Sequence, residues 1–206
     1  MSKLYIVGVG PGSKDYLTEV AVNTVEKSDI IIGSKRALDL FETNTKKVQI
    51  NAKNMNKSLK VAISKVEEGM IVALLSTGDP GFSGVLKPIL NLKSDIEIEV
   101  IPGVSSVQLC TAKLKIPWDD ADLLTLHGKG TSMDILDVID NGKPTIILPN
   151  FKPAELAESL IEKGIDKNRK ATICEKLSYE DEKIVEATLK DISEMEFSYM
   201  CVMVVY

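Results

Sequence analysis

Four loops rich in glycine or proline contain most of the residues whose types and spacing could do chemistry. They span residues 8–12 (GVGPG), 76–84 (STGDPGFSG), 101–106 (IPGVSS) and 126–130 (LHGKG). Glycine lets a ligand lie against the backbone, and amides at the start of a helix bind anionic groups. In an open α/β sheet the ligand crevice lies beyond the carboxyl ends of the strands, so the three loops of the first half could converge at one edge.

The first loop resembles the start of a dinucleotide-binding fingerprint but departs from it in three places. Ser13 stands where the third glycine belongs, and Asp29 precedes the next strand, whereas a ribose-binding acid should lie at that strand's end. Pro11 also removes an amide donor where a pyrophosphate needs one. A tight strand-to-helix turn is the alternative to a ligand-binding loop.

Three side-chain types in the other loops could bind or react. Asp79 could accept hydrogen bonds from a ligand hydroxyl or ammonium, or it could cap the following helix. Ser105 and Ser106 offer hydroxyls to an anion at a helix start, and simple N-capping is the alternative. His127 is the only histidine and could act as an acid, a base or a donor near neutral pH, or be incidental.

Composition excludes several classes of protein. The 206 residues are 44% hydrophobic and 27% charged, which is typical of one large or two small globular domains. A net charge of −5 with only two arginines argues against nucleic-acid binding. No apolar run reaches the roughly 18 residues of a membrane span, and the N-terminus lacks the features of a signal peptide, so we expect a cytoplasmic protein. The odd, widely spaced Cys110, Cys174 and Cys201 predict core thiols, with neither a disulfide framework nor a metal site.

Alternating strands and helices must position these loops. In the first half we expect strands near residues 4–9, 30–32, 71–75 and 96–100, and helices near 17–25, 55–66, 85–90 and 105–113. This order predicts a mostly parallel sheet with helices on both faces. In the second half we expect strands near 123–126, 145–148, 171–174, 184–189 and 199–205, and helices near 133–139 and 153–163. Its three successive last strands predict a mixed sheet. The polar break at residues 115–122 divides the chain into domains 1–115 and 120–206.

The loops taken together resemble a known family. GVGPG, STGDPGFSG and IPGVSS look like the tetrapyrrole (corrin/porphyrin) methylase superfamily. GDPGFSG, the run PGVSSVQLCTAKLKIPWDDADLLTLHGK and the segment CEKLSYEDEKI are similar to its cobalt-precorrin-7 C(5)-methyltransferase branch. The resemblance covers essentially the whole chain. It implies a homodimer with a two-domain α/β fold: an N-terminal, mostly parallel sheet with flanking helices, a C-terminal mixed α/β domain, and the methyl donor in the cleft between them.

The resemblance also implies an activity. It is the S-adenosyl-L-methionine-dependent C-methylation of a corrin precursor in cobalamin biosynthesis, at C(5) of cobalt-precorrin-7, giving cobalt-precorrin-8 and S-adenosyl-L-homocysteine. The ring supplies the nucleophile, so the enzyme mainly has to align the two reactants. The donor-binding positions carried over are Pro11, Gly78, Asp79, Phe82, Ser105, Ser106, Leu148, Pro149, Lys176, Leu177 and Thr188, without a metal. His127 is the hypothesised base. Candidate partners for the ring's carboxylates are Lys14, Lys35, Arg36, Lys113 and Lys129, with ordinary solvated charge as the alternative.

Other interpretations remain at this point. A diphthine synthase-like enzyme or a ribosomal RNA methyltransferase would share the fold. A nicotinamide-dependent oxidoreductase would use the first glycine loop to bind its cofactor. A noncatalytic ligand-binding or scaffold protein is the last alternative. Some members of the branch carry a fused second domain that decarboxylates the ring and methylates it at C(15). We expect this chain to add a single methyl group and a separate partner enzyme to act at C(15).

Overall fold

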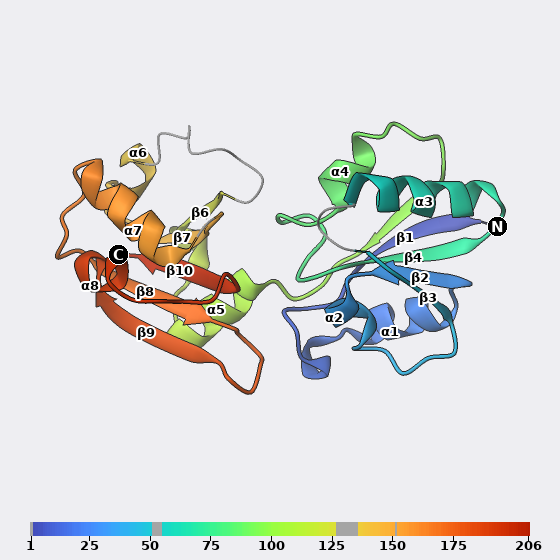
Figure 1. The fold of residues 1–206 in the computed structure, drawn as a ribbon, viewed down its shortest axis with the longest axis horizontal. Helices are drawn as coiled ribbons and strands as arrows, with labels where there is room; N and C mark the ends of the chain where they lie inside the picture. Colours follow the sequence, from blue (N-terminus) through green and yellow to red (C-terminus); the bar gives the residue numbers. More distant parts are fainter. Residues whose placement is uncertain (1, 51–54, 127–135, 151) are drawn as a thin grey trace. The chain divides into compact units, whose positions relative to one another are not determined.

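The computed structural model describes residues 2–50, 55–126, 136–150 and 152–206, and Figure 1 shows its fold. The chain divides into two compact units, Met1–Ser105 and Ser106–Tyr206. Each unit contains its own five-stranded sheet. The polar break at residues 115–122 predicts a later boundary, and the helix at Ser106–Leu114 accounts for the difference.

The first unit contains a parallel sheet with the strand order β3-β2-β4-β1-β5, as the alternation of elements predicts. Its strands are β1 (Lys3–Gly8), β2 (Ile30–Gly33), β3 (Lys46–Gln49), β4 (Ile71–Ser76) and β5 (Ile98–Ile101). Its helices are α1 (Glu19–Glu26), α2 (Lys35–Leu38), α3 (Met55–Glu67) and α4 (Leu86–Leu90), with a 3-10 turn at Lys14–Tyr16. Parallel strands need such crossover connections.

Both faces of this sheet are buried. Successive side chains of a strand point to opposite faces, so Ile30 and Ile32 pack in a cluster with α3 and α4, whereas Ile31 packs with α1 and α2. Figure 1 shows these two pairs of helices on opposite sides of the sheet. Burial on both faces is the reason that the central strands β2 and β4 are continuous apolar runs without alternation.

Two short elements of the first unit escape sequence prediction. The helix α2 is capped by Ser34, whose Oγ accepts a hydrogen bond from the amide of Ala37 at 3.3 Å. The strand β3 has the sequence KKVQ and lies at the edge of the sheet, where lysines are common. Neither segment has an apolar period long enough to predict its structure.

The second unit contains the mixed sheet that the sequence predicts, with the order β6-β7-β10-β8-β9. β6 pairs with β7 in parallel, and all other pairs are antiparallel. Its strands are β6 (Asp122–Thr125), β7 (Thr145–Leu148), β8 (Lys170–Glu175), β9 (Lys183–Thr188) and β10 (Cys201–Val205). Its helices are α5 (Ser106–Leu114), α6 (Leu136–Ile139), α7 (Pro153–Glu162) and α8 (Leu189–Ser193), with a 3-10 turn at Trp118–Asp120.

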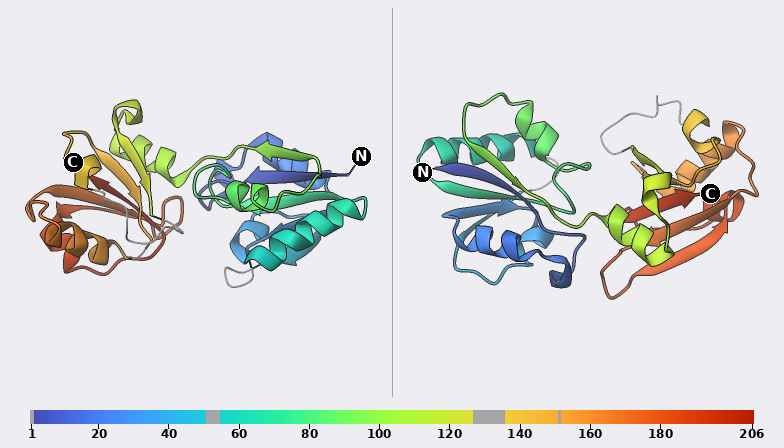
Figure 2. Two further views of the ribbon diagram at one scale, coloured as in Figure 1. Left: turned by 90° about the horizontal axis from the view of Figure 1, so that it is seen from above. Right: turned by 180° about the vertical axis from the view of Figure 1, so that it is seen from behind.

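Helix α5 belongs with the second sheet. One face of that sheet packs against α7 and α8, and α5 contacts β10 from the other face. Lys113 of α5 forms an ion pair with Glu182, 2.7 Å between Nζ and Oε1. Figure 2 shows this yellow-green helix beside the orange and red strands in both views. Among the described residues, no helix is long and apolar enough to cross a membrane.

Candidate functional site

Three loops of the first unit meet at the carboxyl edge of its sheet. β4, β1 and β5 are neighbours, so the loops that follow them lie side by side. The amide of Val9 donates to the carbonyl of Ser76 at 2.9 Å, and the amide of Gly78 donates to the carbonyl of Gly10 at 2.7 Å. These bonds join the first two loops, as expected from the order of elements.

Glycines are required where the third loop packs against the other two. A Cβ added to Gly103 would lie 2.5 Å from the carbonyl oxygen of Gly78 and 2.7 Å from the carbonyl carbon of Gly8. All the nearest atoms are backbone, which cannot rotate away. Gly78 differs, because its φ is +68° and an added Cβ would meet only the Cα of Ser105, at 3.8 Å. The three loops, residues 8–12, 76–84 and 101–106, are called the loop cluster below. Its backbone is tightly packed at Gly103, whereas there is space beside Gly78.

Asp79 connects the second and third loops. Its Oδ1 accepts a hydrogen bond from the amide of Gly81 at 2.8 Å, and its Oδ2 accepts one from the amide of Gly103 at 3.2 Å. It does not cap α4, because the residue before that helix is Val85 and no side chain caps it. Each carboxylate oxygen can accept a further hydrogen bond. The half-buried carboxylate can therefore also accept a bond from a ligand ammonium or hydroxyl.

The structure brings together most of the residues predicted for the first unit. Pro11 is buried in the loop after β1, and Phe82 is half-buried in the loop after β4. Ser105 is buried at the end of the loop after β5 and adjoins Gly78. Ser106, by contrast, is the first residue of α5 in the second unit.

The predicted residues of the second unit lie along two opposite edges of its sheet, each edge being formed by the ends of its strands. β7 and β8 are both antiparallel to β10, so their carboxyl ends share an edge. Leu148 ends β7 at that edge, and the amide of Lys176 donates to the carbonyl of Met200 there, at 2.8 Å. Pro149 and Leu177 follow these residues directly and are buried.

Thr188 lies apart from them. It pairs with Lys170, at the start of β8 and therefore at the opposite edge of the sheet. Its side chain caps α8: Oγ1 accepts from the amide of Asp191 at 3.1 Å and donates to the Asp191 carboxylate at 2.6 Å. The sequence predicts a strand that extends to Leu189. In the structure β9 ends at Thr188, because the capping box starts α8 at Leu189.

The loop after β8 is held in an unusual backbone conformation. Lys176 and Ser178 have φ values of +49° and +72°, which non-glycine residues rarely adopt. The ammonium of Lys176 is paired with Asp181, and this bond lowers the pKa of the Asp181 carboxyl. The amide of Ser178 donates to Oε2 of Glu182 at 2.8 Å. Strained residues of this kind concentrate at binding and catalytic sites.

Most of the basic side chains proposed for the substrate have partners within the protein. Lys14 pairs with Glu42 at 2.5 Å, Lys35 with Asp39 at 2.7 Å, and Lys113 with Glu182 as described above. Arg36 is exposed on α2. His127 and Lys129 lie outside the described residues. No group of histidine, cysteine or acidic side chains able to hold a metal ion occurs in the described part of the chain.

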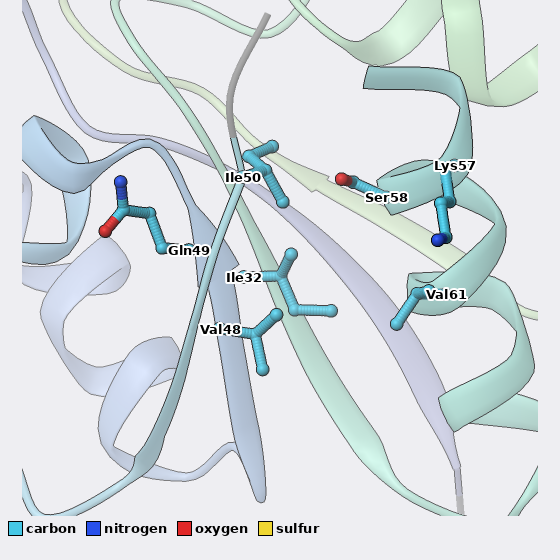
Figure 3. Close-up of a pocket in the computed structure, with 7 residues that line it drawn as sticks. All are labelled: Ile32, Val48, Gln49, Ile50, Lys57, Ser58 and Val61. Atoms are coloured by element: carbon cyan, nitrogen blue, oxygen red, sulfur yellow. The ribbon is translucent and has the colours of Figure 1, made fainter. Parts of the chain in front are cut away.

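A hollow of about 200 Å³ lies beside α3 at the ends of β2 and β3 (Figure 3). Ile32, Val48 and Ile50 line one side of it, with Gln49 among the lining residues but pointing to the other side of its strand. The α3 side is lined by Lys57, Ser58 and Val61. Its volume is below the roughly 300–1,000 Å³ of ordinary ligand pockets, so it is not a complete site by itself.

Residues 3–193 match the family model described as Tetrapyrrole (Corrin/Porphyrin) Methylases. The chain belongs to this family. A probable cobalt-precorrin-7 C(5)-methyltransferase of Methanocaldococcus jannaschii is 44% identical over 204 residues, which cover 98% of this chain and 96% of that protein. Membership of the tetrapyrrole methylases replaces the oxidoreductase hypothesis, and Asp29 agrees with this, because its Oδ2 accepts from the amide of Ile71 at 2.8 Å.

Solved structures of the family share the fold. A precorrin-6Y methylase of cobalamin biosynthesis from Archaeoglobus fulgidus matches with a TM-score of 0.79 at 24% identity, covering 100% of this chain and 98% of that one. A uroporphyrin-III C-methyltransferase from Thermus thermophilus, solved with S-adenosyl homocysteine, matches with a TM-score of 0.80 at 20% identity, covering 98% and 91% of the two chains. These matches confirm the predicted tetrapyrrole methylase fold.

Proposed function

We propose that this protein transfers the methyl group of S-adenosyl-L-methionine to C(5) of cobalt-precorrin-7, giving cobalt-precorrin-8 in cobalamin biosynthesis. The observation that carries the proposal is the 44% identity, over almost the full length of both chains, to the relative of that name. The loop cluster of the first unit supports it, because it offers a backbone-lined surface for the donor, and a methyl transfer in which the ring supplies the nucleophile needs no nucleophilic side chain.

The residues of the loop cluster fit the methyl donor. S-adenosyl-L-methionine supplies an electrophilic methyl group on a positively charged sulfur when it is bound. The open side of Gly78 allows a ligand to approach the backbone, and the carboxylate of Asp79 attracts the donor's cationic groups. Pro11, Phe82 and Ser105 belong to the same three loops. Their role is to orient the donor and exclude water, and orientation can lower such a barrier by about 7–11 kcal/mol.

We also propose roles for residues of the second unit. Leu148, Pro149, Lys176 and Leu177 lie on neighbouring strand ends at one edge, which supports their assignment as donor contacts. Thr188 lies at the other edge and has a complete set of capping bonds, so we assign it to the stability of α8. We further propose that the protein is a cytoplasmic homodimer and that a separate enzyme carries out the C(15) methylation and decarboxylation.

Calorimetric titration with S-adenosyl-L-homocysteine, with NADH in parallel, tests the donor. Saturable binding of the first and none of the second is expected. Methyl transfer from ¹³C-labelled S-adenosyl-L-methionine to cobalt-precorrin-7 then tests the acceptor, and NMR should find a single label at C(5). A label at another ring carbon, or two labels, contradicts the proposed position. Binding of NADH alone contradicts the methyltransferase itself.

The proposed base is tested separately. His127→Ala should slow methylation while leaving S-adenosyl-L-homocysteine binding intact, because proton loss from the ring follows donor binding. If the variant keeps both the methylation rate and the affinity for the ring, His127 is not the base.

A further inference from the structure

Two cysteines of the second unit lie directly against each other. Cys110 of α5 and Cys174 of β8 place their Sγ atoms 3.3 Å apart, although 64 positions separate them in the sequence. Both residues are 0% exposed, and both are free thiols. The methyl transfer proposed above uses neither of them, because neither lies on a strand-end loop.

The third cysteine offers an internal control. Cys201 pairs with Glu175, the residue after Cys174, so it faces the opposite side of the sheet and packs in the cluster with α7 and α8. Its Sγ lies 4.0 Å from the carbonyl oxygen of Tyr199. Cys201 is therefore also buried, although it is 9% exposed and has different neighbours.

We propose that Cys110 and Cys174 form a redox-active pair, which a peroxide oxidises to an intramolecular disulfide that ties α5 to β8. A disulfide joins its sulfurs at about 2.05 Å, so they must approach by about 1.2 Å. Rotation of the two side chains and a small movement of α5 can supply this. The described contacts between α5 and β10 already hold the helix over this sheet.

The chemistry assigns different roles to the two thiols. The S–H of Cys110 donates to Cys174, and this bond chiefly lowers the pKa of Cys174 while the same contact raises the pKa of Cys110. The thiolate of Cys174 attacks one peroxide oxygen, the O–O bond breaks, and a sulfenic acid and water form. The Cys110 sulfur then attacks the Cys174 sulfur and releases a second water. Two thiols and one hydrogen peroxide thus give one disulfide and two waters.

Access to the pair depends on α5. Both sulfurs are covered, so a peroxide reaches Cys174 only when this helix separates from the sheet. Lys113 lies one turn beyond Cys110 and is held by Glu182, which restrains the same helix. We therefore expect Lys113→Met to accelerate oxidation several-fold without changing the product.

Peptide mapping of the full-length protein after hydrogen peroxide treatment, without reduction, tests the proposal. We expect a cross-linked peptide containing Cys110 and Cys174, and a Tm of the second unit about 10 °C higher that returns to its initial value on reduction. Cys201→Ser should behave in the same way. Cys110→Ala and Cys174→Ala should form no cross-link, and circular dichroism checks their folding.

Two results would overturn the proposal. One is oxidation of the wild-type protein to sulfinic or sulfonic acids without the cross-link. The other is a cross-link that forms no faster between Cys110 and Cys174 than between either of them and Cys201. Since these readouts require no methyl transfer, they are independent of the proposed enzymatic function.

Discussion

Gly103→Ala tests the packing of the loop cluster most directly. The alanine Cβ would lie 2.5 Å from the carbonyl oxygen of Gly78, and 2.7 and 2.8 Å from the carbonyl carbon and Cα of Gly8. Real Cβ atoms essentially never approach so closely, and backbone atoms on both sides leave no rotamer that relieves the contact. The loops after β1, β4 and β5 must therefore separate.

Gly103→Ala should lower the free energy of unfolding, because it overpacks a site that cannot expand. Such substitutions cost typically 1–3 kcal/mol, and we expect the upper end, about 3 kcal/mol of unfolding free energy, because the obstructing atoms are all backbone. Gly69→Ala is the matched control. An added Cβ at Gly69 meets nothing within 4 Å, but its φ is +94°, so this substitution costs only backbone strain, about 1 kcal/mol.

Urea denaturation followed by circular dichroism measures both costs, and hydrogen exchange at the β1 amides shows whether the loss is in the first unit. Affinity for S-adenosyl-L-homocysteine, measured by calorimetry, should fall at least tenfold in Gly103→Ala and stay unchanged in Gly69→Ala. If Gly103→Ala unfolds within 0.5 kcal/mol of the wild type, the three loops do not pack as described. If its stability falls while its affinity is retained, the cluster is structural only.

Three further predictions concern side chains. Asp79→Ala should weaken S-adenosyl-L-homocysteine binding, measured by calorimetry, more than Asp79→Asn does. Asparagine keeps one acceptor oxygen for the amides that Asp79 binds, and alanine keeps none. Equal losses of affinity would assign the effect to the charge alone. The hydrogen bond from the Thr188 hydroxyl holds the pKa of Asp191 below its ordinary 3.8. The Asp191 carboxylate therefore stabilises the second unit above pH 3.8, and this stabilisation is lost as the pH falls through the lowered pKa of the folded state. In urea denaturation at a series of pH values, the unfolding free energy of Asp191→Asn should fall less steeply below pH 3.8 than that of the wild type. Equal slopes in the two proteins would contradict the assignment. A double-mutant cycle of Lys113→Met and Glu182→Gln should give a coupling of about 1 kcal/mol in unfolding free energy, and zero coupling would mean that Lys113 is not held by this partner.

Local pattern determined much of the fold. The apolar run Ile30-Ile31-Ile32 predicted a strand buried on both faces, and the spacing of apolar residues from Met55 to Val66 predicted α3. These signals depend only on residues close in the sequence, as does the turn chemistry of the glycine loops. The loops also carried the resemblance that identified the family.

Other features required partners distant in the sequence. Lys14, Lys35 and Lys113 proved to have carboxylate partners, and no local signal names such a partner. The short elements α2, β3 and α8 depend on a cap or on an edge position more than on an apolar period. Hydrogen bonds between distant segments likewise gave Asp79 its role in joining two loops.

The sequence by itself determined every strand except β3, together with the glycine loops and the family. Only the tertiary structure decided that β10 enters between β7 and β8, because a strand's period says which side chains are buried but not which strand it pairs with. That insertion makes β7 and β8 run in the same direction, so that Leu148 and Lys176 share an edge and Thr188 lies at the other. The packing of α5 against this sheet, which brings Cys110 to Cys174, was likewise decided by the tertiary structure.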